Sequence, residues 1–300
     1  MNHNGVPKLT IVGHIAIDKI ITDGGVRIQL GGPPTYTAAT ARLLGLGIDA
    51  ITKIGGDLPE ELKTQIETLG LKPIVVEGAE TTRFILDYRG GERRLSVEAI
   101  CDAIEPWEVE ALGDAVMLSP IIGEVHRETA LRLRGAETLA LDPQGYLRAL
   151  NPDGSVELRP WLDLELLSSI DIYKSTMREL RLIVGVEEPL RALRRLNELG
   201  VGEAIATLGD EGAILSLGDE AYRIPAYRVE AVDPTGAGDV YLAAYLSERL
   251  RGGEPTWCGA VASATASLIV ETVGASFKAS REELQGRAYE IYEGVKRLPG

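Results

Sequence analysis

The chain has 300 residues, 45% hydrophobic and 25% charged, a composition typical of globular proteins and unlike that of disordered or fibrous chains. Its 31 Lys and Arg residues against 45 Asp and Glu residues give a net charge of −14, which disfavours binding to nucleic acid or to an anionic membrane because both require clustered positive charge. We recognise no signal peptide and no apolar run near the ~18 residues of a membrane span, so we expect a cytoplasmic protein. Cys101 and Cys258 are far apart in the sequence, and we expect no disulfides.

The first hundred residues read as strands, helices and two hairpins. A buried strand is expected over 8–16, whose residues are mostly apolar and β-branched. A Gly-rich turn predicts a hairpin over 20–30. The pair Pro33-Pro34 suits the first turn of a helix, because the missing N–H groups would have no partner there. In chain order we then predict a helix over 35–46, a strand over 49–54, a helix over 59–69, a strand over 73–77 and a second hairpin with strands over 82–88 and 93–97.

The rest of the sequence alternates strands and helices. The predicted elements are strands over 115–118 and 138–141 with a helix over 124–134 between them, a strand over 170–173, a helix over 188–199, a strand over 204–208, a β stretch over 213–232 and three helices to the end.

This order predicts the fold class. Alternating strands and helices indicate an α/β fold with a mostly parallel central sheet and helices on both faces. The two hairpins interrupt the alternation early and predict a small β appendage from about 19–30 and 82–98. No repeat or low-complexity linker marks a second domain, so we expect residues 1–300 to form one.

The most informative stretch is VDPTGAGD, which ends at Asp239. Gly236, Ala237 and Gly238 permit close approach of the backbone and then open a helix whose first N–H groups lack partners within the helix. Such an end favours phosphate oxygens. A carboxylate at this position predicts a reaction site, but the pattern alone equally allows a tight turn followed by an Asp239 that complements the helix dipole.

The stretch resembles the C-terminal signature of the ribokinase-like (PfkB) carbohydrate kinase family. The resemblance implies that the amides of Gly236, Ala237 and Gly238 form an anion hole and that Asp239 is the catalytic base. An aspartate has an ordinary pKa of about 3.9, so Asp239 is expected to be ionised at neutral pH. Further matches follow in the family's order and cover nearly the whole chain, which implies a ribokinase-like fold whose β appendage is a lid over the substrate.

The same resemblance implies a set of substrate-binding residues. Asp18 closes a stretch similar to the family's first strand, where that residue binds substrate hydroxyls; alone, it would read as a turn residue. The N-terminal signature places Gly31 and Gly32 at the substrate, and Tyr36 stands where the family has an Asn that helps to read the sugar. Asp57 lies in a turn similar to the family's Gly-x-Asp. Gln144 completes the set, in a segment with Asp142 and Arg148 that resembles the inositol kinase branch.

The nucleotide side is implied by later matches. Thr207, Gly209 and Gly212 resemble the turn that contacts the phosphates or ribose, and Lys174 is assigned to the same side. The family's Asn-x-x-Glu appears with Thr176 in place of Asn, and the retained Glu179 is expected to hold Mg²⁺ indirectly, through water.

These residues predict an ATP-dependent kinase that phosphorylates a hydroxyl group of a small sugar or polyol, with myo-inositol as the leading candidate. The implied cofactors are ATP and Mg²⁺, with a monovalent cation as an open question. The alternatives are a nucleoside or keto-sugar-acid kinase of the same fold and a regulator that binds a sugar or nucleotide without turnover. Because a lid with one exposed sheet face often needs a partner, a homodimer through the lid is a further hypothesis.

Overall fold

The computed structural model describes residues 6–90, 94–110 and 112–299. Within these residues the central sheet has nine strands. Six of them are parallel to one another, from β14 to β4 in the order given below, and β15, β16 and β17 continue the sheet antiparallel at one edge. The predicted mostly parallel sheet is therefore confirmed. Across the sheet the strands are β17 (Lys296–Arg297), β16 (Ala221–Ile224), β15 (Ala213–Ser216), β14 (Glu203–Thr207), β13 (Ile172–Thr176), β10 (Leu139–Leu141), β9 (Ala115–Leu118), β1 (Lys8–Val12) and β4 (Gly47–Ile51).

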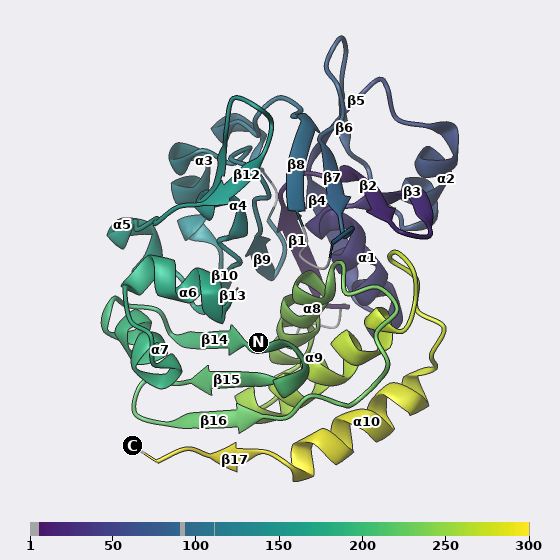
Figure 1. The fold of residues 1–300 in the computed structure, drawn as a ribbon. Coiled ribbons are helices and arrows are strands. Elements are labelled where there is room, and N and C mark those ends of the chain that lie inside the picture. Colours follow the sequence, from purple (N-terminus) through teal and green to yellow (C-terminus); the bar gives the residue numbers. More distant parts are fainter. Residues whose placement is uncertain (1–5, 91–93, 111, 300) are drawn as a thin grey trace.

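Helices cover both faces of this sheet (Figure 1). Successive strand residues point to opposite faces, so Leu9 and Ile11 of β1 belong to one hydrophobic cluster and Val12 to another. The first cluster packs under α1 (Pro33–Leu44), α8 (Ala237–Arg249), α9 (Pro255–Val270) and α10 (Arg281–Glu293). The second packs under α3 (Arg127–Arg132), α5 (Leu164–Leu167), α6 (Met177–Val184) and α7 (Pro189–Glu198). No helix in the described ranges is long and apolar enough to cross a bilayer.

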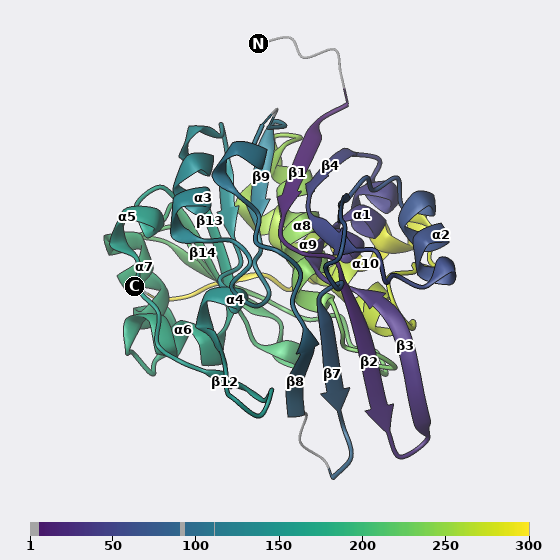
Figure 2. The same ribbon diagram turned by 90° about the horizontal axis from the view of Figure 1, so that it is seen from above.

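The two predicted hairpins form a second sheet, which projects from the α/β body (Figure 2). Its strand order is β3 (Gly25–Gly31), β2 (Ala16–Thr22), β7 (Arg83–Asp87) and β8 (Arg94–Ala99), with the hairpins joined by parallel pairing of β2 and β7. One face carries Asp18, Ile20, Phe84 and Leu86, which are buried or line a cavity. Residues 91–93 of the predicted second hairpin lie outside the described part of the chain.

Several predicted boundaries were wrong. The strand predicted over 49–54 is two strands: β4 stays in the central sheet, and β5 (Lys53–Gly55) pairs with β6 (Ile74–Val76) in a separate ribbon, next to α2 (Glu60–Thr68). The strand predicted over 8–16 likewise divides into β1 and the start of β2. The β stretch predicted over 213–232 ends at Ile224, because Pro225 follows and cannot donate to a ladder.

Other elements were not predicted. They are α4 (Gln144–Leu147), β11 (Arg148–Leu150), β12 (Val156–Leu158), α5, α6 and β17. For α6 the signal was present: Thr176 and Glu179 form a reciprocal capping box, and Gly185 ends the helix in the left-handed conformation, at φ 67°.

Candidate active site

A cavity of about 290 Å³ opens between the second sheet and the carboxyl ends of the central strands. The second sheet contributes an apolar wall, Phe84, Leu86 and Leu95, and also Asp18. The opposite side is polar and comes from the ends of β10 and β13, from α4 and from the turn that opens α8. Ligand sites at the carboxyl ends of parallel strands are the rule in open α/β sheets.

The turn before α8 has a backbone that only glycine suits. Gly236 has φ 77°, and a Cβ built there would lie 2.3–2.4 Å from ring atoms of Tyr36. Gly238 lies against Lys174: a Cβ at Gly238 would be 2.7 Å from Nζ. The turn therefore brings the first turn of α8 close to a buried ammonium group, next to the cavity.

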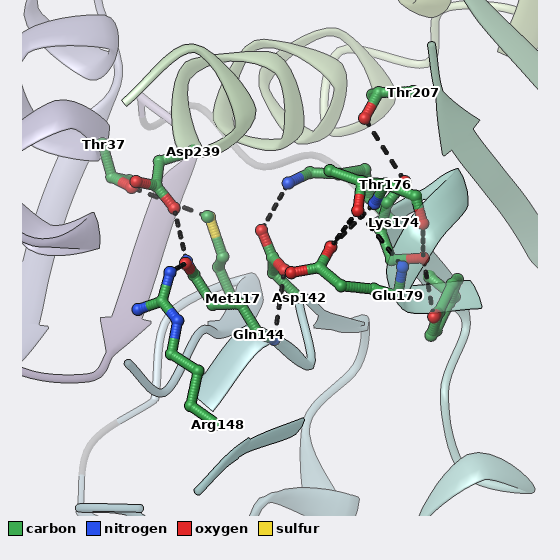
Figure 3. Close-up of polar contacts among 12 residues, drawn as sticks. Thr37, Met117, Asp142, Gln144, Arg148, Lys174, Thr176, Glu179, Thr207 and Asp239 are labelled. Carbon is green, nitrogen blue, oxygen red and sulfur yellow. Dashed lines mark hydrogen bonds and ion pairs between the residues drawn. The ribbon is translucent and has the colours of Figure 1, made fainter. Parts of the chain in front are cut away.

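Asp239 belongs to a chain of hydrogen-bonded side chains, shown in Figure 3, whose members all line the cavity. Its Oδ1 accepts a hydrogen bond from Nε2 of Gln144 at 3.3 Å, and Oε1 of Gln144 accepts one from Nη2 of Arg148 at 2.8 Å. Arg148 also donates from Nη1 to the backbone oxygen of Ile121 at 2.9 Å. These bonds fix the carboxylate of Asp239 toward the open space.

A buried ion pair lies beside this chain. Nζ of Lys174 donates to Oδ2 of Asp142, and both side chains are almost fully buried. Burial alone would lower the pKa of Lys174, but the carboxylates of Asp142 and Asp239 raise it above its ordinary value. Lys174 is therefore a fixed positive charge in the wall of the cavity.

The electrostatics of Asp239 differ from the expectation. Burial and the nearby carboxylate of Asp142 raise the pKa of Asp239 from 3.8 to about 7, although Lys174 and Arg148 act in the opposite direction. The carboxyl group is thus harder to ionise than the ordinary aspartate that the sequence predicted. A pKa near the working pH suits a general base.

The structure brings many of the predicted site residues to one cavity. Those that line it are Asp18, Gly32, Tyr36, Gln144, Lys174, Glu179, Gly236, Gly238 and Asp239. Tyr36 lines it only with the margin of a buried ring, whose hydroxyl accepts a hydrogen bond from Gln29 at 3.4 Å. The cavity edge near Thr176 is formed by the capping box, in which Oε2 of Glu179 accepts bonds from the Thr176 hydroxyl and amide.

Six predicted residues are not among those that line the cavity: Gly31, Asp57, Thr207, Gly209, Gly212 and Ala237. Asp57 accepts hydrogen bonds from the amide and hydroxyl of Thr81 and pairs with Arg83 at 2.7 Å, so it fixes a turn. The amide of Ala237 donates to the oxygen of Pro234 at 3.3 Å.

The four remaining residues also have structural positions. Gly31 packs against the carboxylate of Asp18, which a Cβ at this position would meet at 2.1 Å. The hydroxyl of Thr207 donates to the oxygen of Ser175 at 3.3 Å, between β14 and β13. Gly209 and Gly212 flank the short turn between β14 and β15.

Sequence reasoning missed part of the cavity wall. Phe84, Leu86, Leu95 and Ile121 were not assigned to the site, and Asp142, Arg148 and Thr176 were noted in motifs without a role. The alternation of Phe84 and Leu86 along one strand was the available signal, because residues two apart share a face.

Comparisons with known proteins agree with this geometry. Residues 147–282 match the pfkB family carbohydrate kinases. A cytidine kinase of Thermococcus kodakarensis is 28% identical over 261 residues, which cover 81% of this chain and 89% of the relative. An ATP-dependent 6-phosphofructokinase of Thermoanaerobacterium thermosaccharolyticum is 36% identical over 272 residues, 80% of this chain and 81% of the relative.

Among solved structures is a pyrophosphate-dependent kinase in the ribokinase family, complexed with a pyrophosphate analog and myo-inositol. It superposes with a TM-score of 0.79 at 24% identity, and the match covers 93% of this chain and 99% of that kinase. That likeness shows that the fold is ribokinase-like. The sequence matches go further, and we conclude that the chain belongs to the pfkB family of carbohydrate kinases and is a phosphotransferase of that family.

Proposed function

We propose that this kinase transfers the γ-phosphoryl group of ATP to a hydroxyl group of a small polyol, with myo-inositol as the first candidate. The observation that supports it most is the buried carboxylate of Asp239, held by Gln144 at the opening of α8 and facing a cavity that also presents Asp18. A proton acceptor beside a helix N-terminus suits phosphoryl transfer to an alcohol, because the carboxylate can take the proton and the helix N-terminus can bind the phosphate.

The residues suggest a mechanism. Asp239 takes the proton of the acceptor hydroxyl while that oxygen attacks the γ-phosphorus in line with the leaving ADP. The amides of Gly238 and Asp239, in the first turn of α8, and the ammonium of Lys174 stabilise the negative charge on the transferred group. Since the reaction depends mainly on positioning, the hydrogen bond that orients Asp239 matters as much as its basicity.

A magnesium ion fits this site only with help from the donor phosphates. The described residues contain no group of three or more His, Cys, Asp and Glu placed to hold a metal ion. Glu179 uses Oε2 for its capping box and borders the cavity, which fits a carboxylate that holds the ion through water. When bound, Mg²⁺ would neutralise charge on the donor phosphates.

The cavity supports a polyol acceptor. Its volume of about 290 Å³ is close to the lower end of the ~300–1,000 Å³ range of ligand sites, which suits a small acceptor such as a single ring. Phe84, Leu86 and Ile121 offer apolar surface to a C–H face, while Asp18 and Gln144 offer partners to hydroxyl groups. The second candidate acceptor is a nucleoside, which the likeness to the cytidine kinase favours.

The test is a panel of acceptors assayed for ADP release. We expect myo-inositol to give the highest kcat/KM among myo-inositol, ribose, cytidine and a keto-sugar acid. Highest turnover of cytidine would establish the second candidate. A protein that bound acceptors but released neither ADP from ATP nor phosphate from pyrophosphate would be a regulator. That result would contradict the proposal. Repeating the assay in K⁺ and Na⁺ salts measures dependence on a monovalent cation.

The raised pKa of Asp239 predicts the pH dependence of the reaction. The protonated carboxyl cannot accept a proton, so kcat/KM for the acceptor should fall on the acid side of about pH 7 and reach a plateau above it. Steady-state rates between about pH 5.5 and 9 measure this limb. A flat profile through neutral pH would contradict the raised pKa, because a base with the ordinary pKa of about 3.9 would stay ionised across this range.

The outer face of the second sheet supports a homodimer through the lid. On the edge strand β3, Val26 and Ile28 are 62% and 58% exposed, and they share one face of the sheet. Light scattering should give a dimer for the wild type and a monomer for Ile28→Glu, because burial of a carboxylate in an apolar contact is costly. A monomeric wild type would contradict this part of the proposal.

A further inference from the structure

An ion pair joins the lid to the loop that precedes α8. On β3, Nη2 of Arg27 donates to Oδ2 of Asp233 at 2.7 Å. The side chain of Asp233 is only 5% exposed, whereas that of Arg27 is 39% exposed. Neither residue is among those that line the cavity. The contact therefore lies outside the cavity and joins the lid to the loop that leads to the cavity-lining turn.

Asp233 organises the turn that carries the glycines. Its Oδ1 accepts a hydrogen bond from the amide of Thr235 at 3.0 Å, one residue before Gly236. The amides of Val232 and Asp233 both donate to the oxygen of Val270, at 2.7 and 3.0 Å. The backbone is thus anchored upstream of the turn, and the carboxylate of Asp233 is the link between Arg27 and the start of α8.

The contact between the lid and this turn contains several buried polar atoms. Within the described residues, Arg27 Nε, Gln29 Oε1 and Thr235 Oγ1 are buried without a hydrogen-bond partner. Arg27 and Gln29 lie opposite Ile20 and Asp18 of β2, so all four side chains are on the lid face that looks toward the body.

We propose that Arg27 is a positioning residue, which couples the lid to the phosphoryl end of the site by holding Asp233 and thereby the turn that opens α8. This inference rests on the proposed kinase reaction. An acceptor bound to Asp18 fixes β2 and its partner β3, and β3 carries Arg27. Acceptor binding then prepares the amides at the start of α8 for the transferred group, and hydrolysis of ATP without an acceptor stays low.

The test compares Arg27→Met and Arg27→Lys with a matched control, Arg89→Met. Arg89 also forms an ion pair in the lid, but with Asp87 of its own hairpin. Because misplacement of reacting groups is costly, we expect Arg27→Met to lower kcat at least about tenfold. The KM of the best acceptor of the panel should change less than about threefold, because Arg27 does not line the cavity. Arg27→Lys should recover part of kcat, and Arg89→Met should leave it within about twofold of the wild type.

A double-variant cycle with Asp233→Asn separates this coupling from a general structural role. If the two residues act as one link, Arg27→Met combined with Asp233→Asn should lower kcat no more than the stronger single variant. Hydrogen exchange of the free protein gives a readout without substrate: the amides of 235–240 should exchange faster in Arg27→Met and not in Arg89→Met.

Two results would overturn the inference. One is a kcat of Arg27→Met within about twofold of the wild type with unchanged exchange at 235–240. The other is a fold-decrease of kcat in the double variant that equals the product of the fold-decreases in the two single variants. Failure of the wild type to phosphorylate any acceptor would instead reject the proposed function, and the exchange experiment would still test the link.

Discussion

Replacement of Asp239 by Asn is expected to lower kcat by ~10²–10⁴, the usual contribution of a positioned general base. Asn has nearly the same shape and keeps an oxygen that accepts the hydrogen bond from Gln144, but it cannot take the proton of the acceptor. The KM for ATP should stay within about threefold, because the start of α8 is unchanged. Retention of more than about half of the wild-type kcat would rule out Asp239 as the base.

The same variant should be more stable than the wild type above neutral pH. The pKa of Asp239 is raised to about 7 in the folded chain, so folding favours the protonated form. Its contribution to stability is present below the ordinary pKa of about 3.9 and is lost as the pH rises through about 7. The melting temperature of Asp239→Asn should therefore exceed that of the wild type at about pH 8, and the difference should vanish near pH 4. Equal melting temperatures at both pH values would contradict the raised pKa.

Gly236→Ala is expected to cost about 2–5 kcal/mol of unfolding free energy and most of the activity. The new methyl carbon would stand 2.3–2.4 Å from the ring of Tyr36, and φ 77° is unfavourable for any residue with a Cβ. Tyr36 is buried against Val240 and Ile269, so the ring has little room to move. Relief of the overlap must shift the start of α8 and with it Asp239.

Gly185→Ala is the matched control for this variant. Gly185 has φ 67°, and no atom lies within 4 Å of the position of its Cβ. Urea denaturation of both variants separates the cost of the backbone conformation, which they share, from the overlap with Tyr36. If Gly236→Ala proved as stable as Gly185→Ala, the close packing of the turn on Tyr36 would be refuted.

The parts of the site that were predictable are contiguous in the sequence. The glycines before Asp239 mark a tight turn or an anion site by local chemistry, and the family resemblance decided between the two. The capping box of Thr176 and Glu179 is also local, although α6 itself was not predicted. The two hairpins were predictable as well, because their alternation reports a sheet with two different faces.

The parts that were not predictable depend on the meeting of distant segments. Lys174 lies in β13 and Asp142 directly after β10, and nothing in either segment reveals their ion pair or its effect on Asp239. The Gly-x-Asp motif likewise did not reveal the partners of Asp57, which are Thr81 and Arg83, and its role at the substrate stays a prediction. The pKa of a carboxyl group depends on burial and neighbours, which periodicity does not report.

Phosphorus NMR of the reaction products tests the central claim most directly. The wild-type enzyme, ATP, Mg²⁺ and the best acceptor of the panel should give a new phosphomonoester signal coupled to a carbinol proton of the acceptor, in a one-to-one ratio with ADP. Asp239→Asn should give the same signal at a rate lower by ~10²–10⁴. Formation of inorganic phosphate alone by the wild type, or an undiminished rate in Asp239→Asn, would contradict phosphoryl transfer to a hydroxyl group with Asp239 as the base.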